Sequence, residues 1–355
     1  MNKRMSNLKI FVFDGINFVP VARQFCEALN ELQTCVMYVD PRTFPIKSFY
    51  RIRRAWLRKI NKIFSRGYSV CSRLSKHSEK RLRNQILKFK PDILLVVGLS
   101  WVLVPEGFLR SLKEQLNCRL ILFDTESGNF LCHEKFVHYL SHEINQYDQV
   151  VSFSKTMTEY FQSLNIPVTY FPFGFTKQLD VSQECPMQYD ICFIGSPNFR
   201  RLFILEKLKK YNLVVYGKGW KKFKPFMSQE LIKKTIFKSI GGGELIQALK
   251  TSKIVLNITN EDFFGIYSGI NLRPFEAIAY ECFMLTDYSD ELAALFDVGQ
   301  EIATYNSYND LIEKVDYYLA NDELRLRVAK QGHLKYLSRC TWIHRARDFL
   351  SIIKN

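Results

Sequence analysis

Arginines that follow an apolar run are the first candidates for chemistry in this sequence. The segment GSPNFRR at 195–201 comes directly after the apolar run 189–194 and opens a helical stretch. Glycine lets a backbone approach a ligand closely, helix N-termini attract anions, and guanidinium groups match phosphate oxygens in fork geometry. The alternative interpretation is an ordinary capped turn between a strand and a helix. We predict a diphosphate site made by Gly195, Ser196, Arg200 and Arg201.

A second candidate segment, SGINLRPFE at 268–276, follows the apolar run 253–258. Arg273 and Glu276 are three residues apart, so they share one face of a helix whose first turn contains Pro274. A carboxylate accepts hydrogen bonds from both hydroxyls of a ribose, while an arginine one turn away neutralises a pyrophosphate. The alternative is an ion pair on the helix surface. We predict that the segment binds a nucleoside diphosphate through Asn271, Arg273 and Glu276.

Two further groups of residues carry weaker signals. Gly217 and Lys218, in VYGKGW at 215–220, can pack a base or a sugar, although a tight turn after a strand explains them equally well. Histidines at helical spacing can ligate a metal, but the group here lacks an H-E-x-x-H pattern and an anchored third ligand. No Asp-x-Asp motif occurs either. We therefore expect no metal site, and no cofactor besides a nucleotide-linked substrate; the histidine group consists of His133, His138 and His142 with Glu143.

The elements that position these residues alternate along the chain. Apolar runs separated by amphipathic stretches are typical of parallel sheets covered by helices. They lie at 8–13, 35–39, 92–97, 119–123, 149–153, 189–195, 212–217, 253–258 and 283–286. An irregular segment at 172–188 carries two prolines and a glycine but no sustained hydrophobic period, which is typical of a linker. A chain of 355 residues also exceeds the size at which one core usually stops growing.

The predicted fold class is therefore α/β, with two Rossmann-like, doubly wound parallel-sheet domains facing a central cleft. Ligands bind such sheets outside the carboxyl ends of the strands. The expected boundaries are an N-terminal domain at 1–172, a linker at 173–188 and a C-terminal domain at 189–340. A last helix at 341–355 is expected to pack back on the N-terminal domain.

Composition narrows the class of protein. Hydrophobic residues make up 47% of the chain, and no run of 18 or more apolar residues is present to span a bilayer. The nine cysteines are scattered without a Cys-x-x-C pair, and the first residues show no signal-peptide pattern. We therefore expect reduced thiols and a cytoplasmic protein.

Most of the net charge of +15 lies in one segment. Residues 47–90 hold fifteen Lys and Arg against one acidic residue, Glu79. A segment of this kind attracts an anionic membrane surface or a lipid pyrophosphate and, as the less favoured partner, nucleic acid. The alternatives are a solvated helical surface and core packing of its apolar stripe. The stripe runs at helical spacing through Ile52, Trp56, Ile60 and Ile63.

Taken in order, the motifs of the second half resemble the donor domain of GT-B glycosyltransferases of the group 1-like kind, particularly the CgeB-like (spore-maturation-type) group. The matching segments are DICFIGSP with the following RR, VVYGKGW, SKIVLN, NLRPFEAIAYECFMLTD and YNSYNDLIEK. The resemblance is detailed over 189–345 and looser over 8–175, where KPDILLVV and FDTES match. It implies a GT-B fold and transfer of a sugar from a nucleotide sugar, UDP- or GDP-linked.

The resemblance also implies roles for single residues. Glu276 matches the carboxylate that binds the donor ribose, and Arg273 matches a pyrophosphate contact. Phage DNA β-glucosyltransferase is more distantly similar, because it also has a Gly-Ser turn followed by arginine. Retaining GT-B enzymes usually carry a second glutamate seven residues before the first, where this chain has Gly269. We therefore expect an inverting transfer that needs no metal.

An inverting transfer requires a base near the acceptor hydroxyl. FDTES at 123–127 lies at a predicted strand end, and the resemblance places Glu126 nearest to the catalytic carboxylate, with Asp124 as the alternative. Asp14, in the turn after the first apolar run, is a third candidate. The expected acceptor is a lipid-linked or surface-polysaccharide glycan at the inner face of the membrane. The alternatives are a DNA-modifying glucosyltransferase and a non-catalytic nucleotide-sugar-binding relative.

Overall fold

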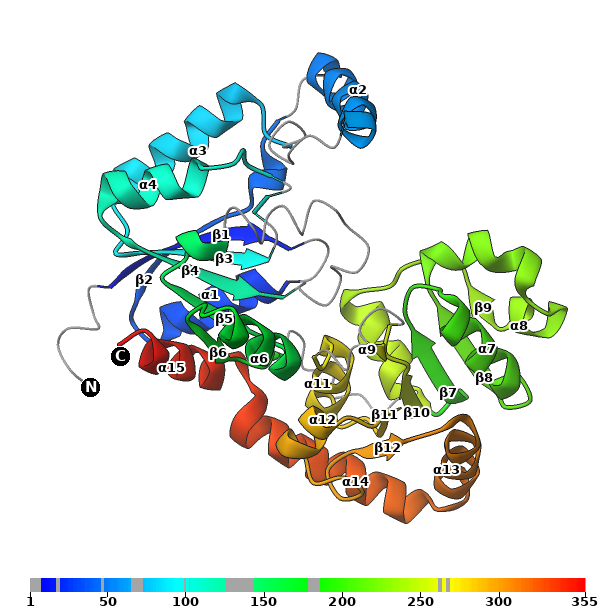
Figure 1. Cartoon of the computed structure of the whole chain (residues 1–355). Coiled ribbons are helices and arrows are strands. Elements are labelled where there is room, and N and C mark those ends of the chain that lie inside the picture. Colours follow the sequence, from blue (N-terminus) through cyan, green and yellow to red (C-terminus); the bar gives the residue numbers. More distant parts are fainter. Residues whose placement is uncertain are drawn as a thin grey trace. The chain divides into compact units, whose positions relative to one another are not determined.

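The computed structural model of the chain describes residues 8–16, 20–45, 48–64, 73–98, 100–101, 103–125, 144–177, 186–260, 264–265 and 269–354. The chain divides into two compact units (Figure 1). Unit 1 comprises Met1–Pro172 together with Trp342–Asn355, and unit 2 comprises Phe173–Thr341. Each unit is built around its own parallel sheet.

Unit 1 has a six-stranded sheet in the order β2-β1-β3-β4-β5-β6. Its central strands read as unbroken apolar runs because helices cover both faces of the sheet. The strands are β1 (Lys9–Gly15), β2 (Cys35–Val39), β3 (Ile93–Gly98), β4 (Arg119–Asp124), β5 (Gln149–Ser152) and β6 (Val168–Tyr170). The helices are α1 (Val21–Glu31), η1 (Pro41–Thr43), α2 (Ser48–Phe64), α3 (Lys76–Phe89), α4 (Phe108–Leu116), η4 (Ile144–Gln146), α6 (Lys155–Ser163) and α15 (Trp342–Ile352).

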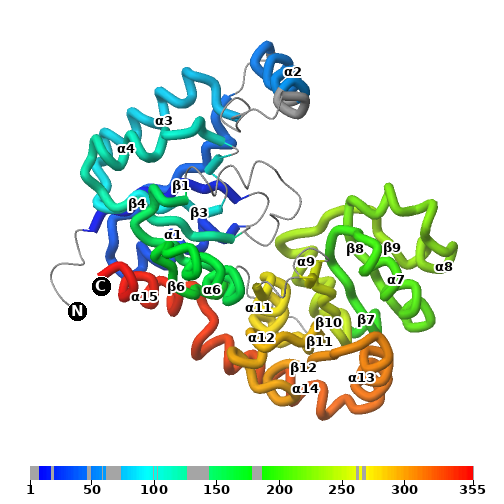
Figure 2. The backbone as a smooth tube through the Cα atoms, in the orientation of Figure 1, coloured from blue at the N-terminus to red at the C-terminus, as the bar shows by residue number. Residues whose placement is uncertain are grey.

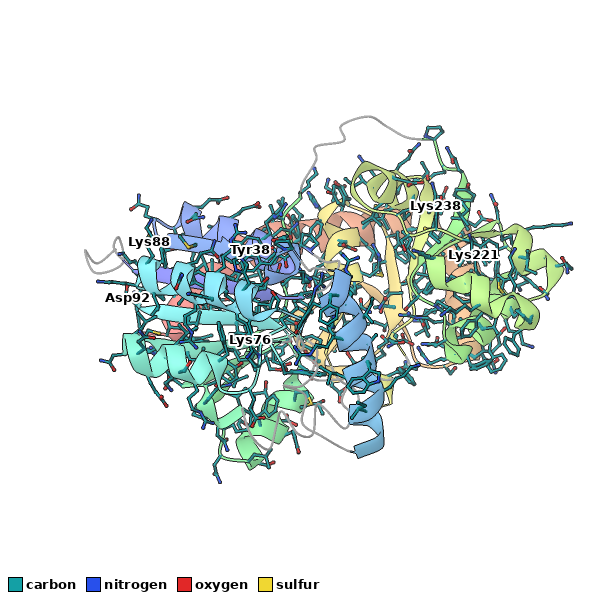
Figure 3. All side chains as sticks on the ribbon, turned by 90° about the horizontal axis from the view of Figure 1, so that it is seen from above. Tyr38, Lys76, Lys88, Asp92, Lys221 and Lys238 are labelled. Carbon is teal, nitrogen blue, oxygen red and sulfur yellow. The ribbon has the colours of Figure 1, made fainter. Side chains whose placement is uncertain are left out.

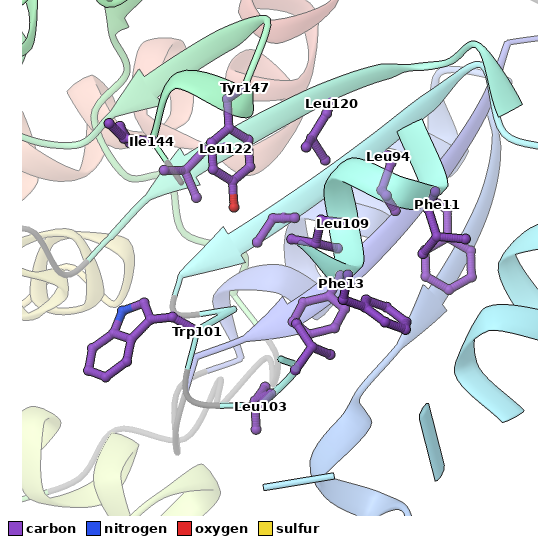
Figure 4. Close-up of a cluster of buried hydrophobic side chains, with 14 of the residues drawn as sticks. Phe11, Phe13, Leu94, Trp101, Leu103, Leu109, Leu120, Leu122, Ile144 and Tyr147 are labelled. Atoms are coloured by element: carbon purple, nitrogen blue, oxygen red, sulfur yellow. The ribbon is translucent and has the colours of Figure 1, made fainter. Parts of the chain in front are cut away.

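One face of this sheet packs against α3 and α4. Figure 4 shows Leu109 of α4 over the strands that carry Phe13 and Leu122, in a cluster whose members are almost fully buried. Side chains alternate between the faces of a strand, so Phe123 points to the opposite face. There its ring packs against Phe171, with the ring centroids 5.1 Å apart.

The opposite face carries α1 and the last helix of the chain, α15. Figure 2 shows α15, drawn in red, returning to unit 1. Trp342 is fully buried, its indole nitrogen donates to Gln24 Oε1 at 2.9 Å, and its ring lies 5.4 Å from that of Phe25. Phe349 contacts Phe25 at the same centroid distance. The core of unit 1 is therefore completed by residues that follow unit 2 in the sequence.

Unit 2 has a second six-stranded parallel sheet, in the order β12-β11-β10-β7-β8-β9. Several helices that follow its strands begin at an Asn or Ser whose side chain accepts a backbone N–H, as expected of N-caps. The strands are β7 (Tyr189–Ile194), β8 (Leu213–Tyr216), β9 (Thr235–Ile236), β10 (Ser252–Asn257), β11 (Met284–Asp287) and β12 (Ala303–Tyr305). The helices are α7 (Phe199–Leu208), η5 (Lys218–Phe226), α8 (Gln229–Lys233), α9 (Gly242–Lys250), α11 (Leu272–Ala279), α12 (Asp290–Leu295), α13 (Tyr308–Ala320), α14 (Asp322–Lys335) and η6 (Tyr336–Cys340).

The predicted fold class is confirmed, and all nine predicted strands are present. The sequence pattern missed β6, β9 and β12, which pair at the sheet edges and contain only three, two and three residues. So short a strand has no room for an apolar run, and it forms because a long neighbouring strand supplies hydrogen-bond partners.

Candidate functional site

The strand order of unit 2 reverses between two neighbouring strands, β7 and β10. The chain leaves β7 for β8 and β9 on one side, then crosses back to β10 and continues to β11 and β12 on the other. In doubly wound sheets, ligands bind outside the carboxyl ends of the strands at such a switch point. The loops that start at Gly195, after β7, and at Ile258, after β10, are therefore the first place to look for a site.

The turn after β7 is held against the turn after β8 by a hydrogen bond and by close packing. The indole nitrogen of the fully buried Trp220 donates to the Gly195 carbonyl at 3.0 Å. A Cβ on Gly217 would lie 2.3 Å from that carbonyl oxygen, and a Cβ on Gly219 would lie 2.7 Å from Pro197 Cδ. The predicted ligand-binding Gly217 thus has a packing role that requires glycine, and Lys218 beside it is exposed. Ligand contacts by these two residues stay a prediction.

Arg201 ties the turn after β7 to the end of β10. Its guanidinium donates twice to the Ile258 carbonyl, from Nε at 2.9 Å and from Nη2 at 2.7 Å. Nη1 donates to the carbonyl oxygen of Ser196 at 2.8 Å and to its hydroxyl at 3.2 Å. The residue is only 7% exposed. We therefore assign Arg201 to positioning of Ser196, while its predicted direct contact with a diphosphate stays a prediction.

Arg200 is held at the same end of the sheet by Asp287. The two side chains form an ion pair, and Arg200 Nη1 also donates to the Thr259 carbonyl at 2.9 Å. Asp287 in turn accepts from the backbone nitrogen of Thr259 at 2.5 Å. The Arg200 guanidinium lies 3.7 Å from the centroid of the Phe264 ring. These contacts fix the direction of Arg200 before any ligand arrives.

Arg273 and Glu276 form the ion pair expected from their spacing. Arg273 Nη1 lies 2.5 Å from Glu276 Oε2, and the side chains are 18% and 14% exposed. The pair is therefore largely buried, in contrast to the surface pair considered as the alternative. Arg273 Nε is buried without a hydrogen-bond partner in the described part of the chain. A buried donor of this kind is costly unless a partner satisfies it.

Asn271 caps the helix that carries this pair. Its Oδ1 accepts from the backbone nitrogen of Arg273 at 3.1 Å, and its Nδ2 donates to Asn257 Oδ1 at 3.1 Å. Asn257 is the last residue of β10, so the start of α11 is fixed to the switch point. Gly269, two residues before the cap, has a φ of +67°. Glycine adopts that conformation readily, whereas a glutamate there would be strained.

The positive charges of the three arginines converge at this edge of the sheet. The pKa of Arg201 is lowered to about 10, first by burial and then by Arg200 and Arg273, with Asp287 opposing the shift. Burial raises the pKa of Cys192, within β7, to about 12, and the positive charge of Arg273 opposes this rise. A bound anion would relieve the repulsion among the guanidinium groups. The site is therefore suited to a phosphate-bearing ligand.

Two cavities lie beside these residues. One has a volume of about 390 Å³, within the usual range of ligand pockets, and its lining includes Arg200, Phe264, Asp287 and Tyr305. The other has about 30 Å³, room for about one water molecule, and its lining includes Asn257, Gly269 and Asn271. Sequence reasoning missed Asp287, Phe264 and Asn257. The end of each apolar run was the available signal, because Asn257 and Asp287 close β10 and β11.

The candidates for the catalytic base belong to unit 1. Asp124, the last residue of β4, is 6% exposed, and its Oδ2 accepts from the Ser152 hydroxyl at 2.7 Å. Asp14 accepts from the Tyr38 hydroxyl at 2.5 Å and pairs with Arg42 at 3.2 Å. Burial raises the pKa of Asp14 although both partners act in the opposite direction. Glu126 and the histidine group at 133–143 lie outside the described residues, within which no cluster of potential metal ligands is found.

Comparisons with known proteins fit this geometry. Residues 200–351 match the model of a glycosyl transferase-like family, whereas no curated protein matches the chain. Sucrose-phosphate synthase from Thermosynechococcus elongatus is 12% identical, with a TM-score of 0.63 over 98% of both chains. An α-glucosyltransferase solved with UDP-glucose and DNA is 14% identical, with a TM-score of 0.63 over 98% of this chain and 100% of that one. The Anabaena protein HepE, solved with UDP and glucose, is 9% identical, with a TM-score of 0.61 over 98% and 99%.

The family match covers most of unit 2, and the similar structures cover both units. The chain has the GT-B fold, and its residues 200–351 match a glycosyl transferase-like family. The matched residues include all five charged candidates of the donor site: Arg200, Arg201, Lys218, Arg273 and Glu276. Gly195 and Ser196 precede the matched region. The CgeB-like subgroup stays a prediction.

Proposed function

We propose that the enzyme transfers a sugar from a UDP- or GDP-linked donor, bound at the switch point of unit 2, to a lipid-linked or surface-polysaccharide acceptor. The observation that carries the donor half is the convergence of Arg200, Arg201 and Arg273 at the carboxyl ends of β7 and β10. Two of the similar structures were solved with UDP or UDP-glucose, which supports a uridine nucleotide as part of the donor.

The proposed reaction is an inverting displacement. The acceptor hydroxyl oxygen attacks the anomeric carbon, the bond from that carbon to the diphosphate oxygen breaks, and the hydroxyl proton passes to a carboxylate of unit 1. Glu126 is the proposed base, with Asp124 as the alternative. Negative charge develops on the leaving diphosphate, where Arg273 and the N-terminus of α11 stabilise it without a metal. Replacement of Glu126 by Gln should abolish turnover while donor binding persists.

Donor binding is tested by thermal denaturation with a panel of nucleotide sugars. A nucleotide at one hundred times its Kd stabilises the folded state by about 2.7 kcal/mol, so a matching donor gives a clear shift. Arg273→Ala and Glu276→Ala should each weaken binding at least tenfold, because each removes a charged partner of the ligand. Arg327→Ala and Glu323→Ala, at exposed positions of α14, are the matched controls. The donor site is refuted if no nucleotide sugar stabilises the protein, or if all four variants bind alike.

The basic helix α2 supports an acceptor at an anionic membrane surface. Phe49, Ile52 and Trp56, spaced along one helix face, are 79%, 70% and 62% exposed. Core packing, the alternative for this stripe, is therefore wrong for Ile52 and Trp56. Lysines near an anionic membrane contribute about 1 kcal/mol each, and exposed apolar side chains add to this by insertion. No helix in the described residues is long and apolar enough to cross a membrane, so we propose peripheral contact at the inner leaflet.

DNA glucosylation is the second candidate, because one similar structure was solved with UDP-glucose and DNA. The same basic residues would then contact backbone phosphates, and binding would weaken steeply as salt rises. Flotation with anionic vesicles and binding of duplex DNA, each measured over a salt series, separate the two acceptors. Tight duplex binding without vesicle binding would replace the lipid-linked acceptor by DNA and leave the donor site unaffected.

A further inference from the structure

Unit 2 carries four clustered phenylalanines beside the donor site. Phe199 and Phe203 belong to α7, and Phe223 and Phe226 to η5. The ring of Phe199 lies 5.3 Å from that of Phe223 and 5.5 Å from that of Phe226, while Phe203 lies 6.1 Å away. Phe203 and Phe226 are 64% and 61% exposed, and Phe199 is 46% exposed. We call these four residues the aromatic patch.

The aromatic patch is held in place by the core of unit 2. Phe223 packs against the main core cluster, and its ring lies 6.0 Å from that of the fully buried Trp220. Trp220 is in turn bonded to Gly195, so η5 is fixed to the turn after β7. The exposed rings are therefore presented on a rigid base. Contiguous apolar surface with a polar rim usually marks an interaction site.

The rim of the aromatic patch is strongly basic. Besides Arg200 and Arg201 of the donor site, residues 199–210 and 218–226 hold seven lysines against one acidic residue, Glu206. Glu206 is already engaged, because it accepts from Lys209 Nζ at 3.1 Å and from the backbone nitrogen of Ser228 at 2.7 Å. Figure 3 labels Lys221 on this part of unit 2. The exposed lysines of the rim are Lys207, Lys210, Lys218, Lys221, Lys222 and Lys224.

We propose that the aromatic patch and its lysine rim dock on an anionic phospholipid bilayer. The exposed phenylalanine rings would enter the boundary between head groups and acyl chains, and the lysines would contact the anionic head groups. A single-stranded nucleic acid would need separate ring faces on which to stack its bases. Here the rings pack on one another at 53° and 72°, which makes one continuous apolar surface. The patch lies in unit 2, so it is distinct from α2 and independent of the acceptor proposed above.

The test compares flotation of the full chain with vesicles of phosphatidylcholine containing about one third phosphatidylglycerol. Phe203→Ser combined with Phe226→Ser should weaken partitioning at least tenfold, because both rings would no longer enter the bilayer. Leu326→Ser combined with Leu337→Ser is the matched control, since these leucines of unit 2 are 59% and 53% exposed. The control should change partitioning less than twofold.

The outcome is decided by controls for folding and for charge, together with the comparison of vesicle partitioning. Thermal denaturation of both double variants should match the wild type, since exposed positions are replaced, and an unchanged nucleotide shift would show an intact donor site. Vesicles of phosphatidylcholine alone should bind the wild type more weakly, as should the anionic vesicles at high salt. Equal partitioning of the phenylalanine variant and the wild type overturns the proposal. The proposal is also overturned if the phenylalanine variant loses oligothymidine binding while its vesicle binding is unchanged. That result would assign the patch to nucleic acid.

Discussion

Gly217→Ala is expected to damage the proposed donor site through a steric clash with the backbone. The new Cβ would lie 2.3 Å from the Gly195 carbonyl oxygen and 2.7 Å from Trp220 Cδ1. An ordinary contact begins at 3.4 Å, so the turn after β7 must move by about 1 Å. Overpacking of this kind costs about 1–3 kcal/mol, and strain on the hydrogen bond between Trp220 and Gly195 adds about 1 kcal/mol. We expect a total loss of about 3 kcal/mol in the free energy of unfolding of unit 2.

The assay is thermal denaturation with and without UDP. For a unit of 169 residues (173–341), this loss lowers the Tm by about 6–12 °C. UDP affinity should fall as well, because the displaced turn carries the predicted diphosphate contacts. Gly241→Ala is the control, because the new Cβ would meet nothing within 4 Å and the φ of −160° suits alanine. The free energy of unfolding of this variant should differ from that of the wild type by less than about 1 kcal/mol. If Gly217→Ala matches this control in both Tm and UDP affinity, the interlocked turns do not shape the site.

Further predictions concern the two cores. Alkylation at pH 8 followed by mass spectrometry should label the exposed Cys35 in the native protein and Cys192 only after unfolding, because burial raises the Cys192 pKa to about 12. Burial also raises the pKa of Asp14 above 3.8, so the folded state binds this proton more tightly than the unfolded state. Denaturant titrations should therefore show the wild type gaining stability relative to Asp14→Asn as the pH falls from 7 towards 4. Trp342→Ala should destabilise unit 1 by about 3–5 kcal/mol in the same titrations, since Trp342 is fully buried against Phe25. A loss below 1 kcal/mol would show that α15 is dispensable.

The sequence predicts the central strands well because each is a long apolar run. The order of these runs also predicts that four charged residues lie at one edge of a sheet, since each follows a strand of the same sheet. These residues are Arg200, Arg201, Arg273 and Glu276. The sequence cannot show which arginine is free for a ligand. The Arg201 guanidinium donates its hydrogen bonds to the carbonyl oxygens of Ile258 and Ser196. These partners come within reach only when the loops have folded.

Asp287 shows the same limit. It closes a predicted strand, but its role depends on Arg200, 87 residues away, and on the Thr259 nitrogen. Local patterns carry no information on pairings of such separation. The proposed catalytic base is harder to predict, because its candidates lie in unit 1 while the proposed donor-binding residues lie in unit 2. The spacing within either unit does not determine which carboxylate meets the sugar.

The return of α15 to unit 1 has a consequence for biosynthesis. Protein synthesis adds about 5–20 residues each second, so the 169 residues of unit 2 separate Pro172 from Trp342 by roughly 10–30 seconds. During that interval the nascent N-terminal sheet lacks the cover that Trp342 and Phe349 give to Phe25. The face that α15 later buries is then open to chaperones and to aggregation. We expect the ribosome-bound chain to complete the later unit before the earlier one.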